Sequence, residues 1–180
     1  GFHLFEPVDL ALYTAQLASM FRAATERAGI ELAVEAAALT HEAVVDREMW
    51  AKIVSNLLSN ALKFTFEGGI TVRLSEVEVE GAPRIELSVT DTGVGIAESE
   101  QAHLFERFHC VAGVRSRTHE GSGIGLALVA ELVAIHGGTV SATSAPGAGS
   151  TFTVQVPFGS PRPASEDVAS GELSDAPGVP

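Results

Sequence analysis

Two asparagines and a lysine follow one another at helical spacing in the segment KIVSNLLSNALKF. Asn56 and Asn60 are four residues apart and Lys63 lies three residues further on, so their side chains project from one face of a helix. Asparagine is a poor helix former, and a repeated one therefore suggests a chemical role. Amide oxygens can coordinate a hard cation such as Mg²⁺ while the lysine lies near an anion. The alternative is a polar helix face in contact with solvent.

A second polar group ends a predicted buried strand in the segment VTDTGVGI. Asp91 is followed by Gly93 and Gly95. A carboxylate at this place can accept a hydrogen bond from an exocyclic amine, and the glycines let a ring or a ribose approach the backbone. The segment is also compatible with an ordinary turn in which Asp91 caps nearby N–H groups.

A third segment, GSGIGL, has three glycines within five residues and leads into an apolar helix. A helix start exposes unpaired N–H groups and the positive end of the backbone dipole. Gly121, Gly123 and Gly125 would let the main chain approach a phosphate closely. A flexible loop before a helix has the same composition, so this segment alone leaves both readings open.

The elements that must position these groups follow from the hydrophobic periodicity. Predicted helices span 9–29, 46–67, 98–108 and 126–136, and predicted strands span 30–36, 42–46, 70–79, 84–91, 139–144 and 151–158. Turns join 70–79 to 84–91 and 139–144 to 151–158 as hairpins. This order favours a two-layer α/β (α+β) sandwich with a mixed, mostly antiparallel sheet and helices packed on one face. The other face would be open or covered by a partner.

Composition restricts the classes of function. The chain has 180 residues, is 46% hydrophobic and carries a formal net charge of -12, which argues against nucleic-acid binding through its overall field. It has no run of eighteen apolar residues, so neither a membrane span nor direct membrane contact is expected. Cys110 is the single cysteine, which suits a reducing, cytoplasmic setting. Residues 159–180 are rich in Pro, Ser, Gly and acids and are predicted to be disordered.

Taken together and in this order, four motifs resemble the ATP-binding catalytic domain of bacterial sensor histidine kinases, in the superfamily that includes DNA gyrase, Hsp90 and MutL. They are NLLSNALKFT (56–65), DTGVGI (91–96), LFERF (104–108) and GSGIGL (121–126). The resemblance implies the Bergerat-type ATP-binding fold over 30–158. Residues 1–29 would be the linker helix from a dimerisation domain.

The resemblance also implies roles for single residues. Asn60 would ligate Mg²⁺ with Asn56 beside it, Lys63 would lie near the phosphates of ATP, and Asp91 would accept a hydrogen bond from the adenine amine. The other implied nucleotide contacts are Gly93, Gly95, Ile96, Phe108, Gly121, Ser122, Gly123, Gly125 and Leu126. Residues 109–123 would form a lid that, without nucleotide, is the least ordered internal segment.

One position bears on the reaction. Where gyrase-like ATPases have a glutamate that activates water, this chain has Asn56, and an amide is not a general base. The resemblance therefore implies transfer of the γ-phosphoryl group to a histidine on a separate dimerisation and phosphotransfer domain, with a response regulator receiver as later recipient. Neither His41 nor His119 lies in the expected setting for that histidine, so no autophosphorylation is expected of this piece alone.

A departure from the family keeps two other functions open. Many relatives have an arginine just after the phenylalanine motif, where this chain has Cys110, and a thiol cannot replace a guanidinium. A nucleotide-binding regulatory module without transfer activity is therefore one alternative. A gyrase-type ATPase that uses water is the other.

Overall fold

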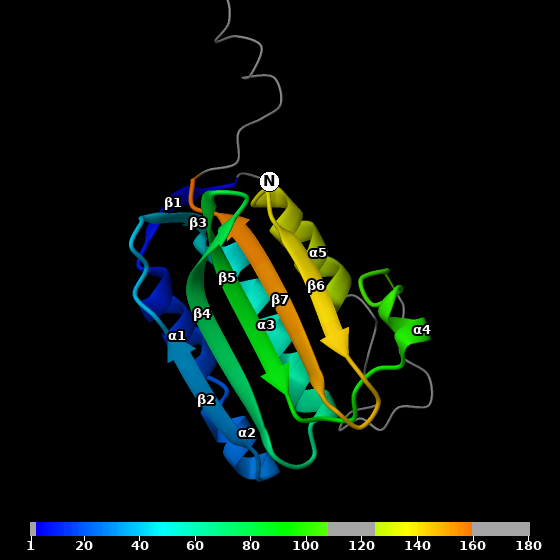
Figure 1. The fold of residues 1–180 in the computed structure, drawn as a ribbon. Helices are drawn as coiled ribbons and strands as arrows, with labels where there is room; N and C mark the ends of the chain where they lie inside the picture. The colour runs from blue at the N-terminus through cyan, green and yellow to red at the C-terminus, as the bar shows by residue number, and fades with distance from the viewer. Residues whose placement is uncertain (1–2, 108–124, 160–180) are drawn as a thin grey trace, which may run out of the picture.

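The computed structural model describes residues 3–107 and 125–159, which form two layers, a sheet and the helices that cover one of its faces (Figure 1). The elements in chain order are β1 (Phe5–Val8), α1 (Leu10–Ser19), α2 (Arg22–Ala28), β2 (Glu31–Ala36), β3 (Ala43–Asp46), α3 (Arg47–Phe64), β4 (Gly69–Val79), β5 (Ala82–Asp91), α4 (Glu98–Gln101), α5 (Gly125–Ile135), β6 (Thr139–Ser144) and β7 (Ser150–Pro157). The predicted fold class is confirmed.

The main sheet has five strands in the order β2-β4-β5-β7-β6. Only the β2 and β4 pair is parallel, and the other three pairs are antiparallel. The β4–β5 hairpin closes through Glu80 and Gly81, whose φ angles are 52° and 80°, the left-handed conformation that suits the twist of a two-residue hairpin loop. The β5 and β7 register places Asp91 opposite Ser150.

The core lies between the sheet and α1, α3 and α5. Ile85, Leu87 and Val89 alternate along β5 and are almost fully buried, as expected for the inner face of a half-covered sheet. On α3, Trp50 and Leu57 are fully buried and close the other side of this core. In Figure 1, α1, α3 and α5 lie behind the sheet, α4 lies beside the edge at β6, and the front face carries no helix in the part of the chain that the structure describes.

The prediction of a single helix over 9–29 is wrong, because α1 ends at Ser19 and α2 begins at Arg22. Asp9 caps α1, accepting from the N–H of Leu12 at 3.2 Å, and Gly29 ends α2 at φ 72°. The break redirects the chain so that α2 packs on β2, where Arg22 donates to the carbonyl of Leu32 at 3.2 Å. α1 itself contacts both α3 and β2.

Two further expectations need correction. Among the described residues 98–107 of the predicted helix over 98–108, only Glu98–Gln101 form an α-helix. Beyond it the backbone bonds span three residues, as from His103 to Glu100 and from Glu106 to His103. The side chain of Gln101 bonds the carbonyls of Ile96 and Ser144 and ties the segment to β6. The N-terminal stretch, where no element was predicted, forms β1, which pairs with β3. By contrast, α5 begins and ends within one residue of its prediction, with Gly137 at φ 74° beyond it.

His136 at the end of α5 is buried as a neutral imidazole. Its exposed fraction is 2%. Nδ1 donates to the carbonyl of Leu132 at 2.8 Å and Nε2 accepts from the N–H of Asp46 at 3.2 Å. Both ring nitrogens are thus engaged in one tautomer. Burial lowers the pKa of His136, although the Leu132 carbonyl and the Asp46 carboxylate act in the opposite direction.

This arrangement predicts a loss of stability in mild acid. Because the folded pKa of His136 lies below its unfolded value of about 6.5, the unfolded chain binds the extra proton more readily and gains from acidification. The free energy of unfolding, measured with urea at pH 7, 6 and 5, is expected to fall with pH. In His136→Gln, which keeps an acceptor for Asp46 and cannot titrate, the fall should be smaller. An unchanged pH dependence in that variant would contradict the assignment.

Candidate functional site

The polar face of α3 meets the start of α5. Asn56 turns its Nδ2 toward its own helix and donates to the carbonyl of Lys52 at 2.7 Å. Its Oδ1 faces Gly125, where an added Cβ would lie 3.0 Å from that oxygen. Because α3 and α5 pack together, the asparagine motif and the end of the glycine-rich motif are brought to one place. Asn60 and Lys63 follow on the same helix, both partly exposed.

Asp91 lies at the end of β5 with an exposed fraction of 4%. Its Oδ1 accepts from the N–H of Gly93 at 2.8 Å. Burial raises the pKa of Asp91, while the backbone N–H groups of Gly93 and Ser150 favour the ionised form. A carboxylate offers about four acceptor positions, so two N–H donors leave capacity for a ligand. The structure therefore provides a buried acceptor at a strand end, as the sequence indicates.

The glycines beside Asp91 are required by close backbone contacts. A Cβ on Gly93 would lie 2.5 Å from the carbonyl oxygen of Phe64, the last residue of α3. A Cβ on Gly95, whose φ is 74°, would lie 1.9 Å from the carbonyl oxygen of Ala145. The loop after β5 therefore lies between the end of α3 and the β6–β7 turn, which brings the residues after Asp91 to the C-terminal end of α3.

Sequence reasoning missed the β6–β7 turn as part of this site. A Cβ on Gly149, at φ 76°, would lie 2.0 Å from the carbonyl oxygen of Asp91. The next residue, Ser150, is buried opposite Asp91, and Ser144 bonds both Ser150 and the N–H of Ile96. The sequence signal was the run APGAGS, which reads as an ordinary hairpin turn until its position beside Asp91 is known.

Several predicted site residues lie outside the described ranges, namely Phe108, Gly121, Ser122 and Gly123, together with Cys110, the lid at 109–123 and the tail from 160. Ile96 is buried and Gly125 and Leu126 begin α5. His41 lies just before β3 and is an exposed partner of Glu76, with Nδ1 and Oε1 2.5 Å apart. Thus the structure brings together Asn56 and Gly125, and separately Asp91, Gly93, Gly95 and Ile96.

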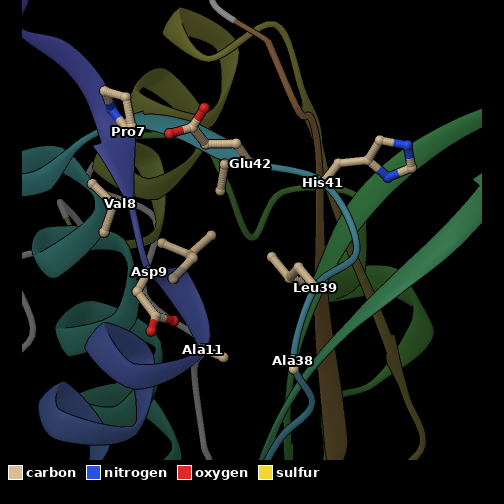
Figure 2. Close-up of a pocket in the computed structure, with 10 residues that line it drawn as sticks. Pro7, Val8, Asp9, Ala11, Ala38, Leu39, His41 and Glu42 are labelled. Carbon is tan, nitrogen blue, oxygen red and sulfur yellow. The ribbon is translucent and has the colours of Figure 1, made fainter.

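A separate hollow of about 400 Å³ lies at the other end of β7 (Figure 2). His41 on its rim contacts Phe158, just after β7, whereas Asp91 pairs with Ser150 at the start of that strand. It is lined by Pro7, Val8, Asp9, Leu10, Ala11, Ala38, Leu39, His41, Glu42 and Ala43. None of the motif residues is among them, so this hollow is distinct from the candidate site.

Two properties hold for residues 3–107 and 125–159, the part of the chain that the structure describes. No group of three or more His, Cys, Asp or Glu side chains there could hold a metal ion. At α3, the amide oxygens of Asn56 and Asn60 are of the type that can contribute ligands to a hard cation. Within the same ranges, no helix has the length and apolar character needed to cross a bilayer.

Comparison with known proteins agrees with this geometry. The family model described as "Histidine kinase-, DNA gyrase B-, and HSP90-like ATPase" matches residues 45–160. The sensor histidine kinase TmoS of Ectopseudomonas mendocina is 34% identical over 158 residues, which is 88% of this chain and 16% of TmoS. Full-length ShkA in complex with AMPPNP matches with a TM-score of 0.75 and 31% identity over 89% of this chain and 32% of that one.

A mycobacterial sensor histidine kinase, MprB, matches with a TM-score of 0.68 and 30% identity over 87% of this chain and 97% of that one. The chain therefore belongs to the histidine kinase-, DNA gyrase B- and HSP90-like ATPase family. Within that family it corresponds to the ATP-binding catalytic domain of sensor histidine kinases, as the four motifs indicated. It spans less than half the length of TmoS and of ShkA.

Proposed function

We propose that this domain binds Mg²⁺–ATP and supplies its γ-phosphoryl group to a histidine on a dimerisation and phosphotransfer domain of the same full-length protein. The observation that carries the proposal is the buried carboxylate of Asp91, enclosed by glycines whose added Cβ atoms would strike backbone. The glycines let the backbone around Asp91 pack closely, and the carboxylate provides a buried acceptor for a ligand that presents a hydrogen-bond donor. A response regulator receiver would be the later recipient of the phosphoryl group.

The following roles are proposed for individual residues of the chain. Asp91 accepts from the base amine, and Gly93, Gly95 and Ile96 shape the base pocket. Asn60, with Asn56 beside it, would hold Mg²⁺, and that ion would supply charge neutralisation at the phosphates. Phosphate contacts are proposed for Lys63, Gly121, Ser122, Gly123, Gly125 and Leu126. Phe108 is proposed as a further nucleotide-binding residue at the entry of the lid.

Water is a poor candidate for the acceptor of the phosphoryl group. Asn56 occupies the place where a water-activating carboxylate would be needed, and its Nδ2 already donates to the carbonyl of Lys52. An amide held in this way cannot take a proton. The site is therefore suited to positioning ATP for an external nucleophile, because phosphoryl transfer relies mainly on positioning and charge neutralisation.

The proposal includes an arrangement of domains. Residues 1–29 would connect to the dimerisation domain, 30–158 would form the catalytic unit, and 159–180 would be a disordered tail. In support, α1 packs against α3, with the buried indole N–H of Trp50 donating to Thr14 at 3.0 Å. A cytoplasmic location fits the supply of ATP and the single cysteine.

Titration with a non-hydrolysable ATP analogue, with and without Mg²⁺, tests the proposal. We expect Mg²⁺ to strengthen binding of the analogue to the unmodified chain. In Asn60→Ala the gain in affinity from Mg²⁺ should be about tenfold smaller, because one of the metal's few protein ligands is removed. Ser59→Ala, next to it and exposed, is the matched control. No binding by the unmodified chain would refute the proposed function. Equal Mg²⁺ dependence in Asn60→Ala would refute the metal assignment alone.

A further inference from the structure

We propose that the Ser144 hydroxyl sets the hydrogen-bonding polarity of the base pocket, making the wall beside Asp91 accept and not donate. The pocket would then select a 6-amino purine over a 6-oxo purine partly through Ser144, a positioning residue that acts through Ser150. This inference rests on the proposed nucleotide site. It adds a determinant of base selectivity that none of the four motifs contains.

The hydrogen bonds of Ser144 leave one possible arrangement of protons. Its Oγ lies 2.8 Å from the carbonyl oxygen of Gly149, which can only accept, so Ser144 donates its single proton there. The N–H of Ile96 can only donate, so Ser144 accepts from it at 2.8 Å. Ser144 Oγ also lies 2.8 Å from Ser150 Oγ. Because the Ser144 proton is already used, Ser150 must be the donor in that bond.

It follows that Ser150 has no proton left for a ligand. Ser150 is the cross-strand partner of Asp91 and is 7% exposed, and its backbone N–H lies close enough to help hold the Asp91 carboxylate ionised. Directly paired residues on neighbouring strands lie within about 5.5 Å at Cβ. Because paired residues share one face of the sheet, a base group that reaches Asp91 would lie beside the lone pairs of Ser150.

Two acceptors side by side favour an amine and disfavour a carbonyl. The 6-amino group of adenine donates, whereas the 6-oxo group of hypoxanthine or guanine accepts and would face Asp91 and Ser150 without a proton between them. Leaving buried polar groups unpaired in this way is what gives a hydrogen-bonding site its discrimination. The inner end of the pocket is also fixed in space, because Gln101 bonds the carbonyls of both Ile96 and Ser144.

The test compares ATP with inosine triphosphate, which carries the 6-oxo group, on the unmodified chain and on Ser144→Ala. Without Ser144 Oγ, the Ser150 hydroxyl is released to donate to a 6-oxo group. The ratio of the two dissociation constants is expected to fall about fivefold, the factor for one ordinary hydrogen bond. Ser141→Ala, on the same strand with an exposed side chain, is the matched control and should leave the ratio unchanged. Ser144→Thr, which keeps the hydroxyl, should restore it.

A purely structural role for Ser144 would weaken both nucleotides equally and leave the ratio unchanged, and that result overturns the inference. If Ser144→Ala fails to fold, the inference is tested on the unmodified chain by comparing its affinities for ATP, inosine triphosphate and purine riboside triphosphate. The last of these has hydrogen at position 6. Affinity should fall from 6-amino to 6-hydrogen to 6-oxo, and a 6-oxo nucleotide that binds as well as the 6-hydrogen one refutes the acceptor-only wall. Failure of ATP itself to bind would instead refute the proposed function.

Discussion

Replacing Asp91 with asparagine is expected to weaken binding of adenine nucleotides about a hundredfold, the upper range for a hydrogen bond to a charged group. In the folded chain the N–H groups of Gly93 and Ser150 both face the Asp91 carboxylate. An asparagine that keeps one of these bonds through its Oδ1 must direct its NH₂ group toward the other N–H or toward the base amine. Either way two donors oppose each other.

The same substitution has two opposing effects on stability. Burial raises the pKa of Asp91, so keeping this carboxylate ionised at pH 7 opposes folding and a neutral amide removes that penalty. The amide also loses one of the bonds from the N–H groups of Gly93 and Ser150, which lowers stability. Because the two effects offset each other, we expect the free energy of unfolding in urea at pH 7 to change by no more than about 1 kcal/mol in Asp91→Asn, while calorimetric titration shows the loss of affinity. A much larger loss of stability would show that Asp91 serves mainly the fold.

Local periodicity in the sequence was enough to predict on which element several candidate site residues lie. Asn56 and Asn60 had to share a helix face because they are four residues apart, and Asp91 had to end a strand because the alternation before it stops there. Gly93 and Gly95 follow that strand end and were therefore expected in a turn. These expectations came from local spacing, and the structure places each residue on the element that spacing indicated.

The parts that sequence could not supply depend on contacts between distant segments. Ser144 and Ser150 become part of the site only through the register that sets β7 beside β5 and β6. The break between α1 and α2 likewise has no local signal, since the residues around Met20 contain neither glycine nor proline. Pairing between remote strands leaves no periodic signal in either strand alone.

Gly95→Ala is expected to be the most damaging glycine-to-alanine substitution in the site. Alanine at φ 74° is strained by itself, and its Cβ would lie 1.9 Å from the carbonyl oxygen of Ala145. That contact is with backbone, so the loop must move away from the β6–β7 turn and the bond from Ile96 to Ser144 must lengthen or break. We expect a loss of about 3 kcal/mol in the free energy of unfolding and at least tenfold weaker nucleotide binding, the factor for about 1.4 kcal/mol.

Gly147→Ala distinguishes the effect of backbone strain from the effect of a steric clash. Gly147 has nearly the same conformation, at φ 77°, and lies in the turn that Gly95 contacts, but an added Cβ there meets nothing within 4 Å in the described structure. Its substitution should therefore lower the free energy of unfolding by about 1 kcal/mol, the strain of a left-handed alanine, and leave nucleotide affinity unchanged. Equal effects of the two variants in urea denaturation and titration would mean that backbone strain alone makes Gly95 necessary. A larger effect of Gly95→Ala on both would show that the close approach of the loop to the β6–β7 turn is what shapes the base pocket.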